Sequence, residues 1–174
     1  MTRVDLRELV RRALSTDDAK TSAFQRIALA AVVLPHGLQK VFGWFGGWGL
    51  SGTIGWFESA LGVPAPIASL VIASDFAGSI ALALGLFTRL TALGSALTML
   101  GAIVMFHAPN GFFMNWSGTK AGEGFEFHLL ALALSLPLVV RGGGAWSLDR
   151  LLSRKLAPAG EQQAPATAHE LGHA

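Results

Sequence analysis

The sequence contains no cysteine, and only 14% of its 174 residues are charged. The absence of cysteine excludes disulfides, thiolate metal sites and thiol chemistry within this chain. In soluble domains, about a quarter of the residues are charged. In this chain 52% of the residues are apolar, they stand in long blocks, and the mean hydropathy is +0.50. Its net charge of only +2 gives no reason to expect a nucleic acid as partner. The composition therefore excludes an ordinary soluble enzyme and predicts one membrane domain.

Four blocks are long enough, or nearly so, to cross a membrane. A spanning helix needs about 20 mostly apolar residues, because each residue adds ~1.5 Å across an apolar layer ~30 Å thick. The blocks cover residues 23–42, 67–87, 90–107 and 125–140, the last being short and interrupted by Pro137. Short turns between consecutive helices favour antiparallel packing. The sequence therefore predicts an all-α integral membrane protein, built as a four-helix up-down bundle.

The basic residues predict how the bundle is oriented. Eleven of the 13 fall on one side of the predicted spans: Arg3, Arg7, Arg11, Arg12, Lys20, Arg26, Arg89, Arg141, Arg150, Arg154 and Lys155. The opposite loops hold only Lys120, and Lys40 lies inside the first span. By the positive-inside rule, both termini are cytoplasmic in a multi-pass protein of the bacterial inner membrane.

Both ends of the chain have the pattern of amphipathic helices that lie on an anionic cytoplasmic surface. Near the N-terminus, apolar residues at helical spacing oppose arginines; they are Val4, Leu6, Leu9, Val10, Ala13 and Leu14. Near the C-terminus, Ser147 is the predicted N-cap of a helix that turns Leu148, Leu151 and Leu152 to the lipid. The predicted division is a cytoplasmic segment 1–22, a membrane domain 23–141, an interfacial helix 142–157 and a disordered tail 158–174.

A glycine-rich segment, residues 43–55, follows the first span and contains Trp44 and Trp48. Its glycines permit an irregular backbone, and tryptophan favours the headgroup level of the membrane. We expect the segment to lie at the outer interface. It is either a flexible interfacial loop or a lid over a site.

Ionisable residues gather at one depth of the predicted bundle. Asp75 lies near the middle of the second span, where a lone carboxylate costs about 3 kcal/mol or more and must find a partner. His36 and Lys40 are four residues apart on one face of the first span, at similar depth. His107 ends the third span, and Glu126 and His128 begin the fourth. All six fall in the outer half of the membrane, whereas the inner halves of the spans read as apolar, so we expect an acid–base cavity reached from the outer face.

Each of these residues also has a structural explanation. Lys40 could extend to the surface, His107 and Glu126 could be solvated at helix ends, and Asp75 could serve only as an ion-pair partner. Small residues near Asp75, among them Ser74, Gly78 and Gly94, are typical of close helix packing.

The sequence has none of the motifs expected of a resident redox cofactor or metal. The ligand spacings of haem, zinc or iron–sulfur centres are missing, and so are a phosphate loop and a dinucleotide fingerprint that would hold a flavin or nicotinamide. Any electron carrier must therefore be lipid-soluble or belong to a partner.

Four segments together resemble the DoxX family of small bacterial membrane proteins. They are Arg26 with HGLQK at 36–40, DFAGSIALALGLFTRLTALG from Asp75, GFEFHLL around Glu126, and RGGGAWSLD ending at Asp149. The resemblance spans residues 24–152. The acid of the second helix is usually glutamate in this family, so Asp75 keeps the charge but shortens the reach.

The resemblance implies a four-helix membrane protein that acts with a redox partner. Founding relatives form the membrane subunit of a thiosulfate:quinone oxidoreductase, and others belong to an oxidoreductase complex that deals with thiol and radical stress. The implied function is that of a redox-complex subunit that contacts quinone, with another subunit supplying the electrons.

The candidate catalytic residues on this hypothesis are Asp75, His36 and Lys40. His36 or His128 would transfer a proton, Asp75 would orient that histidine or relay the proton, and Lys40 would stabilise an anionic quinol oxygen. Residues expected to bind the quinone are His128, Glu126, Trp44, Trp116 and His107, with Phe42 as a further ring contact.

Two other functions stay open. The bundle could be a non-catalytic anchor or assembly module that presents its outer loops to a partner protein. It could instead bind or transport lipids or small molecules, since ionisable groups at mid-depth also occur in carriers.

Overall fold

The computed structural model describes residues 5–158, and this part of the chain is helical with no strands. The helices are α1 (Leu6–Leu14), α2 (Lys20–Phe42), α3 (Gly49–Leu61), α4 (Ala65–Ala73), α5 (Ser79–Leu84), α6 (Thr88–Ala102), α7 (Glu126–Arg141) and α8 (Leu148–Leu156). Short turns join some of them: 3₁₀ turns η1 (Trp44–Gly46) and η4 (Ala108–Asn110), and π-helical turns η2 (Ser74–Gly78) and η3 (Ile103–His107).

Within residues 5–158, two continuous helical stretches have the length and composition to cross a membrane. They are Ala65–Leu84, formed by α4, η2 and α5, and Thr88–Asn110, formed by α6, η3 and η4. A third candidate is α2 taken together with the segment Trp44–Leu61, although the two parts are bent by 97°. α7, with 16 residues, is shorter than a typical span.

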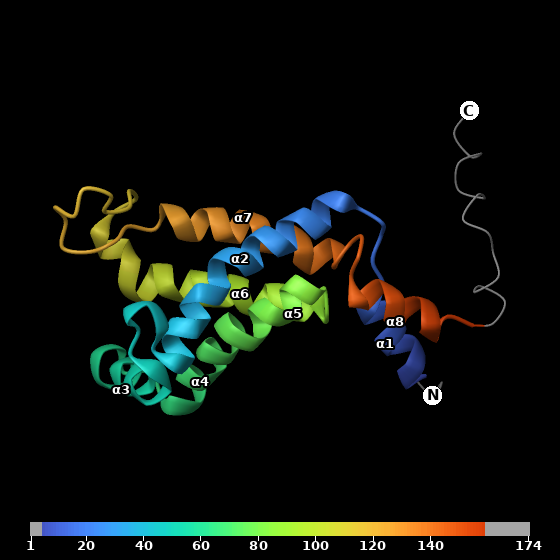
Figure 1. Cartoon of the computed structure of the whole chain (residues 1–174), viewed down its shortest axis with the longest axis horizontal. Coiled ribbons are helices and arrows are strands. Elements are labelled where there is room, and N and C mark those ends of the chain that lie inside the picture. The colour runs from blue at the N-terminus through green and yellow to red at the C-terminus, as the bar shows by residue number, and fades with distance from the viewer. Residues whose placement is uncertain (1–4, 159–174) are drawn as a thin grey trace.

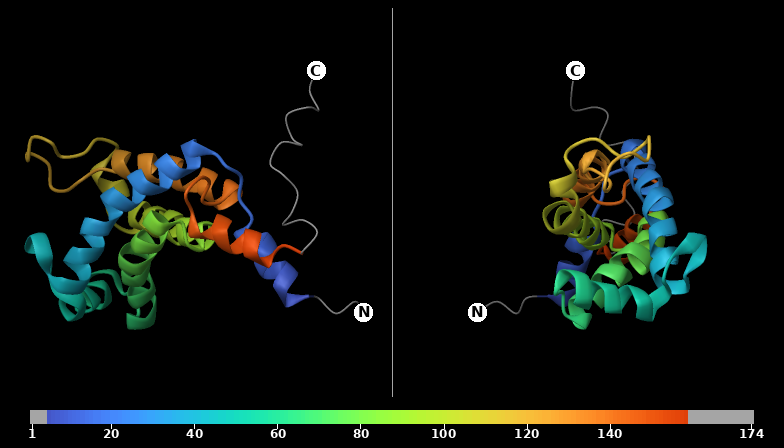
Figure 2. Two further views of the ribbon diagram at one scale, coloured as in Figure 1. Left: turned by 45° about the vertical axis from the view of Figure 1, so that its right-hand side comes forward. Right: turned by 90° about the vertical axis from the view of Figure 1, so that its left-hand side faces the viewer.

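The long helices pack against one another around an apolar core. α2 contacts α5 and α7, and α6 lies along α7, as Figures 1 and 2 show. The core cluster consists of Leu29, Ala30, Val33, Leu82, Ala92, Met99, Ala131 and Leu138. We call the end of the molecule with α3 and residues 111–125 the loop end, and the opposite end, with α1 and α8, the terminal end (Figure 1).

The segment after α2 is an ordered helix rather than a flexible loop. Left-handed φ angles of +74° at Gly43 and +79° at Gly46 allow the chain to turn sharply. At Gly47, a Cβ atom would lie 2.3 Å from the Gln39 carbonyl oxygen, so only glycine fits. α3 forms despite its glycines and lies across the end of α2 (Figure 1). The helix contributes to a cavity wall described below, so residues 49–61 are not a flexible loop, and a lid over a site stays a prediction.

The expectation of apolar inner halves is wrong at Arg26. This arginine lies inside α2 and is buried. Its guanidinium group donates hydrogen bonds to backbone carbonyl oxygens that surround it at the terminal end. The acceptors are Leu82, Ala83, Gly143, Ala145 and Trp146. Asp149, also buried, accepts hydrogen bonds from the backbone N–H groups of Phe87 and Thr88 at 2.7 and 2.8 Å. The RGGGAWSLD segment thus ties α2, α5, α6 and α8 together.

Both predicted amphipathic end helices are present. α1 and α8 pack against each other at the terminal end (Figure 2). Ser147 caps α8 as predicted, since its hydroxyl oxygen accepts from the Arg150 N–H, and Leu148, Leu151 and Leu152 are exposed. Val4 and all but the first residue of the predicted tail 158–174 lie outside the described residues.

Candidate functional site

The carboxylate of Asp75 meets a basic side chain of α2, as predicted. Asp75 is only 1% exposed, and its Oδ2 atom forms an ion pair with the Lys40 ammonium group. Its other oxygen, Oδ1, is buried and accepts no hydrogen bond from the described residues. The ion-pair partner of the carboxylate is therefore Lys40, whereas His36 lies within electrostatic range of it without a hydrogen bond.

A close approach of two backbones brings this ion pair together. A Cβ atom at Gly37 would lie 2.5 Å from the Asp75 carbonyl oxygen and 2.6 Å from Phe76 Cα, so glycine is required there. Asp75 itself belongs to η2, and π-helical turns of this kind are common at functional sites. The extra residue of the turn changes which side chains face α2.

The neighbouring helix α6 touches η2 and then diverges from α4. A Cβ atom at Gly94 would lie 2.9 Å from Ser74 Oγ, which marks the point of closest approach. Toward the loop end the two helices separate, and α3 lies beside the gap (Figure 1). A cavity of about 830 Å³ fills this space.

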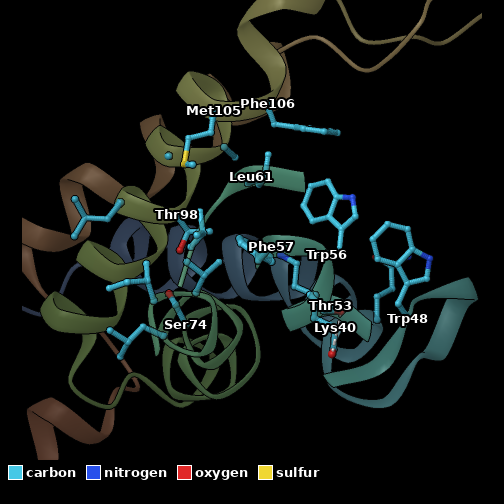
Figure 3. Close-up of a pocket in the computed structure, with 18 of the residues that line it drawn as sticks. Lys40, Trp48, Thr53, Trp56, Phe57, Leu61, Ser74, Thr98, Met105 and Phe106 are labelled. Atoms are coloured by element: carbon cyan, nitrogen blue, oxygen red, sulfur yellow. Dashed lines mark hydrogen bonds between the residues drawn. The ribbon is translucent and has the colours of Figure 1, made fainter. Parts of the chain in front are cut away.

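Most of the cavity wall is apolar. It is formed by Trp48, Trp56, Phe57, Leu61, Val63, Ile67, Leu70, Val71, Leu97, Ala102, Met105 and Phe106, many of which appear in Figure 3. Polar side chains in the wall are Gln39, Lys40, Thr53, Ser74, Thr98 and His107. Among the described residues that line the cavity, Lys40 carries a full charge and no carboxylate is present. The wall can therefore donate hydrogen bonds to an acceptor-rich head group and accommodate an apolar tail.

Tryptophans of α3 and of the turn before it, rather than the predicted ones, contribute to the cavity. Trp48 and Trp56 lie with their ring centroids 5.7 Å apart, and Trp56 contacts Phe106 across the cavity at 5.3 Å (Figure 3). The three predicted ring contacts, Phe42, Trp44 and Trp116, are not among the described residues that line the wall. Trp56 and Phe57 could have been identified as cavity residues only if the spacing of apolar residues in 49–61 had been interpreted as a helix.

Three histidines lie near one another beside the cavity. His107 lines it, and the rings of His107 and His128 have centroids 4.1 Å apart. His128 is 7% exposed. The His36 ring lies 6.1 Å from that of Phe127, and both His36 and His128 are within electrostatic range of Lys40. Of the ionisable residues predicted to form an acid–base cavity, Lys40 and His107 line this cavity, whereas His36, Asp75, Glu126 and His128 do not.

Glu126 and Trp116 form a separate contact at the loop end. Glu126 Oε1 accepts hydrogen bonds from the Met114 N–H and from Trp116 Nε1, both at 3.0 Å. Trp116 is 86% exposed. These two residues fix the conformation of the segment between α6 and α7 and lie outside the cavity wall.

Comparisons with known proteins agree with the membrane character of the fold. The DoxX family profile matches residues 22–108. The chain is 35% identical over 129 residues to "Inner membrane protein YqjF" of Escherichia coli strain K12, covering 74% of this chain and 93% of that protein. It is 30% identical over 124 residues to "Putative oxidoreductase CatD" of Bacillus subtilis strain 168, covering 71% and 81%. No solved structure matches the chain.

Proposed function

The chain belongs to the DoxX family of membrane proteins, and on that premise we propose that it is the membrane subunit of a redox complex and binds a quinone in the cavity between α3, α4 and α6. The observation that carries the proposal is an apolar cavity with Lys40 in its wall. Its volume of about 830 Å³ lies within the usual range of small-molecule sites. The name of the Bacillus subtilis relative supports an oxidoreductase role.

The residues of the wall fit the two parts of a quinone. Trp48 and Trp56 supply aromatic faces for the ring, and Leu70, Leu97 and Met105 supply apolar surface for an isoprenoid tail. Ser74 Oγ is buried and has no hydrogen-bond partner among the described residues.

Lys40 and Asp75 have distinct roles in this proposal. A bound quinone takes up two electrons and two protons on reduction to the quinol. The Lys40 ammonium group donates a hydrogen bond to a quinone oxygen and stabilises negative charge that develops there. Asp75 holds the ammonium group in place through the ion pair. Asp75 is therefore a positioning residue, and Lys40 contacts the substrate.

The proposed membrane arrangement uses α2, the α4–α5 stretch, α6 and α7 as four spans. α7 has 16 residues, about 24 Å of helix, and packs along α6 and α2. Most basic residues lie at the terminal end, including Arg89, Arg141, Arg154 and Lys155. By the positive-inside rule, both termini then face the cytoplasm of the inner membrane.

A partner protein at the loop end supplies the electrons. The chain has no cysteine, and the described residues contain no group of three potential metal ligands. The loop end exposes Phe113 and Trp116, and aromatic side chains of this kind are enriched in protein interfaces. This surface also supports the alternative of an assembly module.

Quinone binding to the purified protein tests the proposal directly. Titration with a short-chain ubiquinone is expected to quench tryptophan fluorescence in a saturable way, because Trp48 and Trp56 line the cavity. Lys40→Met is expected to weaken binding at least tenfold, or about 1.4 kcal/mol. Lys120→Met is the matched control, since that amine donates to the Phe113 carbonyl oxygen outside the cavity. Equal affinities of the two variants would contradict the proposal.

A second candidate function is the binding of a membrane lipid, favoured by the same apolar wall and single cation. Native mass spectrometry of the protein extracted from its own membrane separates the two. A bound quinone supports the redox role, whereas a fatty acid or phospholipid supports lipid binding.

A further inference from the structure

Two stripes of cavity residues, one on α4 and one on the α6–η3 stretch, diverge from a single point of contact. The residues of the α4 stripe are Ile67, Leu70, Val71 and Ser74, and those of the α6–η3 stripe are Gly94, Leu97, Thr98, Gly101 and Met105. Their spacing of three or four residues places each stripe on one face of its helix. At the contact, a Cβ atom at Gly94 would lie 2.9 Å from Ser74 Oγ, so the two helices are closed there.

Gly101 shows that the two helices are apart further toward the loop end. It lies seven residues after Gly94, which is two turns or about 10 Å of helix, and therefore on the same face. Ile67 is the same number of residues from Ser74 on α4. A Cβ atom at Gly101 would have no atom of another described segment within 4 Å. The space between α4 and α6 is therefore open at the level of Ile67 and Gly101.

The rim of this gap is apolar and exposed. Four side chains form it and are 48–67% exposed: Ile67 and Leu70 on α4, and Leu97 and Met105 on α6–η3. They belong to the stretches Ala65–Leu84 and Thr88–Asn110, which have the length and composition to cross a membrane. Apolar side chains exposed within a spanning stretch contact lipid chains. The gap therefore adjoins lipid rather than water, and we call it the lateral opening.

Contacts limit the lateral opening at both ends. The contact between Ser74 and Gly94 limits it toward the terminal end. Toward the loop end, the rings of Trp56 and Phe106 lie 5.3 Å apart and join α3 to η3 (Figure 3). What remains is a passage sideways between α4 and α6.

The size of the cavity indicates what uses this passage. A volume of about 830 Å³ holds a molecule of drug size. A quinone ring with its first isoprene units fits in it, whereas the complete tail of a membrane quinone, with many such units, does not. A bound long-chain quinone must therefore keep part of its tail outside the protein, where an apolar chain is stable only in lipid.

We propose that a long-chain isoprenoid quinone enters the cavity sideways through the lateral opening and keeps the end of its tail in the membrane. The head group lies against Lys40, and the tail leaves past Gly101, where any side chain would narrow the path. Gly101 is thus the residue that admits ligands with a tail. The inference rests on the proposed function for the identity of the head group, but the opening itself can be measured without any quinone.

Gly101→Phe, studied in phospholipid nanodiscs, tests the path of the tail. Binding of a long-chain ubiquinone, measured by quenching of tryptophan fluorescence, is expected to weaken about tenfold, whereas binding of the ubiquinone ring without a tail is expected to be unchanged. Gly101→Leu replaces this variant if it does not fold. Gly55→Phe is the matched control, because the Cβ position of this helical glycine is equally open but Gly55 is not among the described residues that line the cavity. It is expected to bind both ligands as the parent protein does.

A fluorescent label tests the opening without quinone, since the chain has no native cysteine. Thr98→Cys, in the cavity wall, is modified with bimane in vesicles whose phospholipids carry bromine on their acyl chains. The brominated chains are expected to quench this label, and Gly101→Phe is expected to reduce the quenching. Leu100→Cys, on an exposed face of α6 outside the cavity wall, is the quenched control in both backgrounds. Thr119→Cys, in the exposed loop, is the unquenched one.

The outcomes separate the lateral opening from the proposed function. Quenching of the Thr98 label by aqueous iodide but not by brominated lipid would show that the cavity opens to water and would overturn the proposal. So would a Gly101→Phe variant that binds the tailed and the tail-less quinone with the same change in affinity. In either case, binding of the tail-less quinone that depends on Lys40 would leave the proposed function standing. Quenching by brominated lipid in a protein that binds no quinone would contradict the proposed function and exclude quinone as the occupant, leaving a phospholipid chain in the opening.

Discussion

Asp75 and Lys40 join the first two long helices through charges that are largely withdrawn from water. The carboxylate is buried and the ammonium group is half-buried. Removal of one member of such a pair is costly, because the other charge remains without compensation in a medium of low dielectric constant.

We predict that Asp75→Asn lowers the free energy of unfolding by about 3 kcal/mol. Lys40→Met should cost a similar amount, whereas the double variant should recover most of the loss, because neither charge is then unpaired. Denaturant unfolding in detergent micelles measures all three. Asp18→Asn, which breaks the exposed contact with Arg150, is the control and should cost at most about 1 kcal/mol. Additive effects of the two single variants would argue against the ion pair.

At this scale the sequence predicted that Asp75 has a basic partner, but it could not choose between His36 and Lys40. Both lie on one face of α2 at similar depth. The choice depends on the close approach at Gly37 and on the π-helical turn around Asp75, which are tertiary features with no local signal. The sequence analysis named Trp44 and Trp116 as quinone contacts and did not identify Trp48 and Trp56 as cavity residues, because the direction of α3 was unknown.

Among the elements, α3 departs most from what the sequence indicated. Glycines at 43, 46, 47, 49, 52 and 55 suggested an irregular loop. In an apolar surrounding, however, unpaired backbone groups are so costly that a glycine-rich segment gains by forming a helix. α3 then contributes Thr53, Trp56 and Phe57 to the cavity wall.

Gly47→Ala is predicted to displace α3 and to weaken quinone binding at least tenfold. The new Cβ atom would lie 2.3 Å from a backbone oxygen of α2, and backbone cannot move aside as a side chain can. Gly55→Ala is the matched control, because no atom lies within 4 Å of its Cβ position. Alanine also favours the helix, so this variant should bind as the parent does. Fluorescence titration measures both, and equal affinities would show that α3 does not shape the site.

The helix α1 is predicted to lose order in acid. Hydrogen bonds from Arg11 and Arg12 lower the pKa of the Glu8 carboxyl from 4.5 to about 2. A carboxyl with a lowered pKa in the folded state stabilises that state above pH 4.5, and the stabilisation is lost as the pH falls toward 2. The protection factors of the α1 amides against hydrogen exchange, which correct for the intrinsic pH dependence of exchange, should therefore fall over this range. In Glu8→Gln the protection factors should be lower at neutral pH and independent of pH in this range; a parent protein whose protection factors do not change with pH would contradict the assignment.

Across the whole molecule, the two ends differ in chemistry. The terminal end carries most of the basic residues and the buried Arg26 with its carbonyl acceptors. The loop end carries the cavity, the histidine pair and exposed aromatic residues.

The sequence located the helical blocks well, because long apolar runs are a strong signal. The second and third predicted blocks agree with the helical stretches Ala65–Leu84 and Thr88–Asn110. Arg26 was assigned to the flank of the first span because no sequence pattern shows that backbone carbonyls will surround it.

The absence of native cysteine allows the proposed orientation to be tested with single replacements. We predict that Thr119→Cys reacts with a membrane-impermeant maleimide in intact cells. Lys155→Cys is expected to react only after the inner membrane is opened. Both positions are exposed in the structure, so a lack of reaction reflects the side of the membrane. The reverse pattern would place the termini outside.

Photoaffinity labelling with an azidoquinone, followed by mass spectrometry of the adducts, shows where the quinone binds. Adducts are expected in α3, around Trp48 to Phe57, and in α6–η3, around Leu97 to His107, and are expected to be lost on competition with unlabelled quinone. Adducts confined to the opposite groove, where Phe24 and Leu134 lie, or labelling that excess quinone does not reduce, would contradict quinone binding in the cavity.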